Sequence, residues 1–334
     1  RSILLPWYRW DGISYLQIAS SGYGSDAVLT VWPPLYPFLI RAVDSLIHLP
    51  ILSALIVSSL AALAALVLFH RLAEEIVPAE TANRSVFILS IFPTAFFLLA
   101  PYSESLFLAL ACGCFLALRK ERPLLAGLLA GLATLTRMQG VFLAAVIFWE
   151  LIARWTRARP DKATLGIGLV SAGVPILVFA GFNGWIHWGL NYPWPWESLS
   201  FYWGQTAGSP LAGLSQNMRS LFSRETMEHG WLVSSWGDFL AVILTLALLV
   251  LGFRRLPLSW WGWSAVMFVS ATTKIDATSH SLISVSRYIL TLFPLFIVLA
   301  QLLQTRLRFN LWMIFSLAAQ LFLLGFFLIW GWVS

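Results

Sequence analysis

The chain has 334 residues, of which 59% are hydrophobic and only 11% are charged. Soluble domains carry about 25% charged residues, so this composition excludes an ordinary water-facing surface and predicts a polytopic membrane protein. The net charge of +6 would suit a nucleic-acid partner in a soluble protein. Here the basic residues lie in short loops between apolar runs, so topology explains them and no nucleic acid is expected. The cysteine and histidine spacings predict neither a disulfide framework nor a metal site.

The first segment, residues 1–49, is predicted to be an outer loop with some helix. A helix over about 11–20 is followed by a turn around Gly22 and Gly24 and by the proline-broken sequence VWPPLYP at 31–37. Pro37 suits the first turn of a second helix that runs to about Leu46. The chain starts at Arg1, inside this loop, and an N-terminal membrane helix is therefore expected to be missing.

Apolar segments recur after residue 49 and are predicted to be about ten transmembrane helices in one all-α membrane domain. They cover 50–70, 85–101, 105–118, 123–136, 140–153, 164–188, 234–253, 257–273, 287–304 and 309–332. Several are shorter than a full crossing needs, so they are expected to tilt, to extend or to be re-entrant. The long outer loop 189–233 separates a first helix group (50–188) from a C-terminal group (234–334). Its many tryptophans predict either an interfacial aromatic belt or a sugar-binding surface.

The basic residues sort the loops into two sides of the membrane. When the loops alternate, 13 of the 21 lysines and arginines fall on one side, all in short loops. By the positive-inside rule that side is cytoplasmic. The other side holds residues 1–49, 101–104, 136–139, 189–233 and 274–286, and the chemically unusual residues lie there.

Polar and aromatic side chains gather on this outer side, next to apolar helices, where such groups are costly and usually functional. They are Arg9, Asp11, Tyr15 and Tyr36 from the first loop, Tyr102 and Glu104 from PYSES at 101–105, Arg137 and Gln139 from TRMQG at 136–140, and Lys274, Asp276, His280, Arg287 and Tyr288 from 274–288. Guanidinium forks bind phosphate oxygens in pairs, and a carboxylate accepts a proton from an attacking hydroxyl. The set predicts a site for a lipid-linked phosphosugar donor and a hydroxyl acceptor.

Each of these residues also has a structural explanation. Arg137 and Arg287 would snorkel to the membrane interface, and Glu104 would favour a helix N-terminus through the dipole. Asp11 would cap the helix that follows it, and His280 would be an ordinary loop histidine. The sequence alone leaves these alternatives open.

Several motifs occur in order along the chain: WDGISYLQIASSGY at 10–23, PPLYP at 33–37, PYSESLF at 101–107, LTRMQG at 135–140 and SRYIL..FP at 286–294. Together they resemble the GPI mannosyltransferase II (PIG-V type) family, in a prokaryotic-type form. The resemblance implies a GT-C glycosyltransferase, a multi-helix membrane enzyme with a polyprenyl-phosphate sugar donor. It also implies that Asp11 is the catalytic base. Some relatives use a divalent cation, but no motif in this sequence requires one.

The predicted function is transfer of a hexose, with mannose implied by the resemblance, from polyprenyl phosphate to a hydroxyl of a glycan or glycolipid acceptor. Arg137 and Arg287 would stabilise the leaving phosphate. The other residues predicted to bind substrate are Arg9, Tyr15, Tyr36, Tyr102, Glu104, Gln139, His280 and Tyr288. The site would face the extracytoplasmic side of the plasma membrane in a prokaryote, or the lumen of the endoplasmic reticulum in a eukaryote. The alternatives are a lipid-linked-sugar transporter or flippase, and a glycosyltransferase that modifies protein or cell-wall glycan with another sugar.

Overall fold

The computed structural model describes residues 3–24, 26–158, 162–223, 231–276, 282 and 284–333. Regular structure in these ranges is almost entirely helical. The exception is a two-stranded antiparallel pairing between β1 (Gln205–Ala207) and β2 (Lys274–Asp276). The prediction of a mostly helical fold is confirmed.

The N-terminal segment folds as two short helices joined by a compact connection. α1 spans Asp11–Ser21 and α2 spans Leu35–Ile47, with short 3-10 turns at Leu5–Trp7 and Ala27–Val31. Pro37 lies in the first turn of α2, where its missing N–H costs no intrahelical hydrogen bond. α1 and α2 contact each other and form, with residues of α3 (Pro50–Ala73) and α8 (Lys162–Gly184), a second and smaller core that is rich in aromatic side chains.

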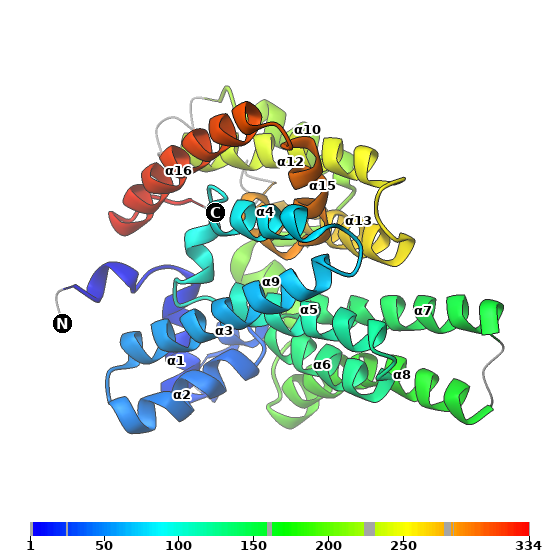
Figure 1. Ribbon diagram of the computed structural model, residues 1–334. Helices are drawn as coiled ribbons and strands as arrows, with labels where there is room; N and C mark the ends of the chain where they lie inside the picture. The colour runs from blue at the N-terminus through cyan, green and yellow to red at the C-terminus, as the bar shows by residue number, and fades with distance from the viewer. Residues whose placement is uncertain are drawn as a thin grey trace.

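The rest of the chain forms a helical body around a larger core. Its helices are α3 (Pro50–Ala73), α4 (Ala79–Ser90), α5 (Glu104–Arg119), α6 (Pro123–Thr136), α7 (Leu143–Ala158), α8 (Lys162–Gly184), α9 (Pro195–Trp203), α10 (Pro210–Ser220), α12 (Leu232–Gly252), α13 (Leu258–Thr272), α14 (Val285–Tyr288), α15 (Pro294–Leu302) and α16 (Arg306–Leu328). In the view of Figure 1, α1–α3 and α6–α8 occupy the lower half and α12, α13, α15 and α16 the upper half.

Five helical stretches among the described residues are long and apolar enough to cross a membrane. They are Pro50–Ala73, Met138–Arg157, Lys162–Gly189, Leu232–Gly252 and Arg306–Leu328, and the pair Val285–Thr291 and Pro294–Leu302, bent by 93°, would make a sixth. These spans make the chain an integral, multi-pass membrane protein. The expected number of about ten is not confirmed.

The other predicted spans are helices, but they are too short or interrupted. α5, α6 and α13 have 16, 14 and 15 residues, which at 1.5 Å per residue reach about 21–24 Å of the ~30 Å of hydrocarbon. The predicted span 85–101 breaks after α4, because the chain passes Pro93 and continues as a 3-10 turn at Ala95–Leu98.

Glycine brings two of these helices into close contact. A Cβ atom on Gly127 of α6 would lie 2.7 Å from the carbonyl oxygen of Ser171 in α8, and one on Gly131 would lie 3.0 Å from the side chain of Val174. This is the packing role that the GxxxG spacing indicates. It fixes α6, whose C-terminal end carries part of the candidate site.

Candidate active site

A pocket of about 170 Å³ lies where the N-terminal segment, the end of α6 and the segment before α14 meet. Among the residues predicted for the site, those that line it are Asp11, Tyr15, Arg137, Gln139, Arg287 and Tyr288. These residues come from separate motifs of the sequence. The fold therefore brings together side chains that are up to 277 positions apart, from Asp11 to Tyr288.

Asp11 is held at the pocket by an ion pair and not by a capping role. The N-cap position of α1 is Trp10, whose φ of 45° makes a sharp turn into the helix, and Asp11 is the first helical residue. Its Oδ2 lies 2.9 Å from Nη1 of Arg287. The side chain keeps 24% of its surface exposed, so one carboxylate is both oriented by a guanidinium and open to the pocket.

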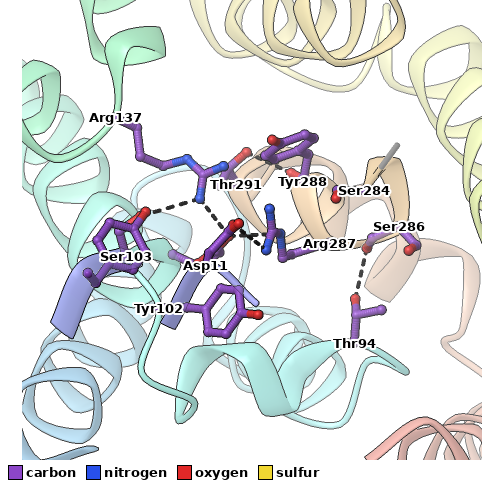
Figure 2. A network of polar contacts seen from close by, with 12 residues as sticks. Asp11, Thr94, Tyr102, Ser103, Arg137, Ser284, Ser286, Arg287, Tyr288 and Thr291 are labelled. Carbon is purple, nitrogen blue, oxygen red and sulfur yellow. Dashed lines mark hydrogen bonds and ion pairs between the residues drawn. The ribbon is translucent and has the colours of Figure 1, made fainter. Parts of the chain in front are cut away.

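Glu104 lies behind the pocket as a fully buried carboxylate, 0% exposed. Its Oε1 accepts a hydrogen bond of 2.5 Å from Nη1 of Arg137 and lies 3.1 Å from Nε of Arg287. The arginine side chains are only 10% and 5% exposed, so neither snorkels to a surface. In Figure 2 the two guanidiniums approach from opposite sides, and dashed lines mark the contacts of Arg137 with Ser103 and of Arg287 with Asp11.

Burial lowers the pKa of Arg137 and the Glu104 carboxylate raises it, with a net direction upward. Arg137 also contacts Ser103, whose Oγ is 3.4 Å from Nη1 and 2.7 Å from the hydroxyl of Tyr15. Burial raises the pKa of Tyr15 far above its usual range. At neutral pH this tyrosine is therefore a neutral hydrogen-bonding group at the pocket wall.

Three cationic side chains lie around the ring of Tyr288. The Cζ atoms of Arg137 and Arg287 lie 4.8 and 5.4 Å from its ring centroid. Nζ of Lys274 lies 4.9 Å from the same centroid and donates a hydrogen bond of 3.0 Å to the Tyr288 hydroxyl. Lys274 lines the pocket. It was not among the substrate-binding residues predicted from the sequence, which include its neighbours Arg287 and Tyr288.

Asp238 was missed by the sequence-based prediction, and it fixes the turn that carries Arg287. It is 3% exposed and lies inside α12, where it accepts hydrogen bonds from the backbone N–H of Ser284 at 3.1 Å and of Ser286 at 2.7 Å. Thr94 also donates a hydrogen bond of 2.8 Å to the carbonyl oxygen of Ser286, as Figure 2 shows. An aspartate within an apolar span is the signal that points to such a role.

The other predicted residues do not line the pocket. Arg9 donates to the carbonyl oxygen of Leu328 and stacks on Trp330, so it ties the N-terminal segment to the C-terminal one. Tyr36 is fully buried, and its hydroxyl lies 2.7 Å from Oγ of Ser58. The buried ring of Tyr102 lies under the Arg287 guanidinium, 5.1 Å from Cζ.

His280 lies outside the described residues. Its expected contact with substrate therefore stays a prediction.

Aromatic rings form another part of the pocket wall. Trp32, Trp203 and Trp332 line it, and the rings of the first two meet edge to face with centroids 5.4 Å apart. Trp203 ends α9 in the tryptophan-rich outer loop. This loop therefore contributes at least one ring to the site, while Trp196 lies exposed elsewhere on it.

In the part of the chain that the structure describes, no group of three or more His, Cys, Asp or Glu side chains is placed to hold a metal ion. The two carboxylates nearest the pocket, Asp11 and Glu104, both contact arginines. Within these residues the site offers cations and hydroxyls to a ligand, which suits an anionic substrate.

Comparison with known proteins identifies a related family for part of the chain. Residues 31–180 match the family model described as dolichyl-phosphate-mannose-protein mannosyltransferase, and no curated protein matches significantly. The match supports a membrane glycosyltransferase of the GT-C type. The match does not show membership of the narrower PIG-V family, and it does not show that the sugar is mannose.

Two similar solved structures come from Archaeoglobus fulgidus. The crystal structure of its oligosaccharyltransferase with Zn and sulfate has 12% identity and a TM-score of 0.46, covering 98% of this chain and 49% of that one. The oligosaccharyltransferase AglB with an inhibitory peptide and a dolichol-phosphate has 11% identity and a TM-score of 0.44, covering 97% and 51%. This chain thus spans about half the length of either protein.

Proposed function

We propose that the protein transfers a hexose from polyprenyl phosphate to an acceptor hydroxyl, and that this hexose is mannose. The observation that carries the proposal is the pocket itself, in which the partly exposed carboxylate of Asp11 contacts Arg287 and shares the cavity with the buried cation of Arg137. A phosphosugar donor needs cations for its phosphate, and its acceptor needs a proton acceptor. Both needs are met within one cavity.

The reaction would be a single displacement with inversion at the anomeric carbon. The acceptor oxygen forms a bond to C1 of the sugar while the bond from C1 to the phosphate oxygen breaks. The hydroxyl proton passes to the carboxylate of Asp11, and the electron pair leaves with polyprenyl phosphate. The cations stabilise the charge that develops on the departing phosphate. Glu104 is fully buried against both arginines, so its proposed part is to position them.

The site would face the extracytoplasmic side. α5 begins at Glu104 beside the pocket and ends at Arg119, and the connection to α6 carries Lys120 and Arg122. Short basic loops stay in the cytoplasm, so the opposite ends of these helices would lie outside. The acceptor would be a glycan or glycolipid. A protein acceptor is the second candidate, because the matching family model names one in its description.

The test is a transfer assay with purified protein in detergent. The wild-type protein is incubated with polyprenyl-phospho-mannose and membrane extract, and mass spectrometry detects a product that gains one hexose. Asp11→Asn keeps the shape of the side chain but cannot take the proton, so we expect kcat to fall by a factor on the order of 10² or more.

Asp44→Asn is the matched control. Asp44 lies on α2, away from the pocket, and accepts a hydrogen bond from Ser53, and Asn retains an acceptor for it. We expect the control to transfer at the wild-type rate. A normally folded Asp11→Asn protein with full activity would remove Asp11 from the mechanism, and a wild-type protein that labels no acceptor would refute the proposed transfer.

A further inference from the structure

We propose that Lys274 binds the phosphate of the lipid donor directly, together with Arg137 and Arg287, whose charges are shared with their own carboxylates. This assignment rests on the proposed function and deepens it. It differs from the prediction made from sequence, in which only the two arginines hold the phosphate and Lys274 is not among the substrate-binding residues.

The balance of charge around the pocket singles out Lys274. Among the described side chains around the pocket, three cations stand against two carboxylates. Arg287 contacts both Asp11 and Glu104, and Arg137 contacts Glu104. Lys274 instead donates its hydrogen bond to the hydroxyl of Tyr288. The excess of one positive charge matches the single negative charge of a phosphodiester such as polyprenyl-phosphate-sugar.

The arrangement of the cations adds a second reason. Arg137, Arg287 and Lys274 all lie within 5.4 Å of the ring centroid of Tyr288. Like charges that gather around one ring repel one another, and more strongly at a partly buried position than in water. A bound anion would relieve this repulsion. Lys274 lines the same cavity as Arg287 and Tyr288, so a phosphate placed there contacts it directly.

The backbone around Lys274 is placed by the long outer loop. Lys274 begins β2 and pairs with Ala207 of β1, next to the pocket-lining residues Trp203 and Gln205. A lysine carries a compact charge on a flexible stem, so it can follow the phosphate as the bond to the sugar breaks. The strand pairing therefore connects the tryptophan-rich loop to phosphate binding.

Binding of farnesyl phosphate, a short polyprenyl phosphate, tests this role without any transfer assay. The three tryptophans of the pocket wall provide a fluorescence signal for titration of the detergent-solubilised protein. We expect Lys274→Met to weaken farnesyl phosphate binding by about tenfold to a hundredfold, the usual contribution of a charged hydrogen bond. Lys274→Arg keeps the charge and should bind within a few-fold of the wild type.

Two controls make the result specific. Farnesol has no phosphate, so its affinity should be the same for the wild type and Lys274→Met, which also shows that the variant pocket is intact. Lys120→Met removes a lysine at the far end of α5, and it should leave farnesyl phosphate binding unchanged. Lys274→Gln, which keeps a polar side chain, should show the same loss as Lys274→Met.

The outcomes separate this inference from the proposed function. If the wild type binds farnesyl phosphate no better than farnesol, the lipid-phosphate donor itself is wrong. If the wild type prefers the phosphate but Lys274→Met and Lys274→Gln bind it within twofold of the wild type, the assignment of Lys274 is overturned and the donor class stands. A loss in both variants that Lys274→Arg restores supports the assignment.

Discussion

Glu104 is predicted to be the most important charged residue for stability, because one buried oxygen contacts two guanidiniums. Glu104→Gln removes the negative charge and leaves Arg137 and Arg287 buried with only Asp11 as a counter-ion. Breaking a buried pair in this way costs about 3–5 kcal/mol. With about 2 cal/mol/K of unfolding entropy per residue, a chain of 334 residues should melt about 4–7 °C lower.

The assay is thermal unfolding of the purified protein in detergent, with Glu121→Gln as the matched control. Glu121 is 80% exposed and lies 3.9 Å from Arg154. An exposed ion pair of this kind contributes less than about 1 kcal/mol, so the control should melt within about 1–2 °C of the wild type.

The double variant Glu104→Gln/Arg137→Gln checks the cause. It removes one negative and one positive charge together, so it should lose less stability than the sum of the two single variants. A Glu104→Gln protein that melts like Glu121→Gln would refute the reasoning, and so would a double variant whose losses simply add.

Three other predictions rest on the fold and the topology. Asp238→Asn takes one acceptor from the turn before α14, so it should cost about 1–3 kcal/mol in thermal unfolding and also lower kcat. Gly127→Ala places a methyl group against Ser171 and should cost about 1–3 kcal/mol, whereas Gly173→Ala, which has open space, should melt like the wild type. A cysteine at Ser209 should react with an impermeant reagent in intact cells while one at Thr81 should not, and the opposite pattern would invert the topology.

The helices could be predicted from the sequence, but their lengths could not. Each apolar run is helical in the structure, because hydropathy reports where a chain prefers apolar surroundings. It does not report where the helix breaks. The run at 287–304 is one apolar stretch in sequence but bends by 93° before Pro294, and the run at 85–101 ends as a helix at Ser90. Local backbone geometry at these points decides whether a run crosses the membrane.

The sequence predicts the site residues that lie in motifs and carry a charge near a helix end. It does not predict side-chain roles that depend on contacts with residues far away in the chain. Asp11, Arg137 and Arg287 meet as a group. Arg9 is only two positions before Asp11 in the sequence, but its side chain turns toward the C-terminal segment, where it contacts Leu328. That contact joins residues 319 positions apart, and no local pattern reports it. A structural role for Asp238 could have been predicted, since an aspartate inside an apolar span requires hydrogen-bond partners.

The positions of the charges help to explain how this protein tolerates them in a buried site. Asp11 is the first residue of α1 and Glu104 is the first residue of α5, while Arg137 is the C-cap of α6. Carboxylates are stabilised by the positive N-terminal end of a helix and cations by the negative C-terminal end, by up to about 2 kcal/mol where partly buried. Each of the three charges therefore lies at the helix end that favours it.

The same helix directions connect the site to the topology. Since α5 starts and α6 ends at the pocket, the basic connection between them, with Lys120 and Arg122, must lie at the opposite ends of both helices. From the positive-inside rule we propose that this connection is cytoplasmic and that the pocket faces the other side of the membrane. A reversed insertion would require the basic loop to cross the membrane and would turn the pocket away from an extracytoplasmic acceptor. The orientation of the chain and the placement of its buried charges thus depend on the same two helices.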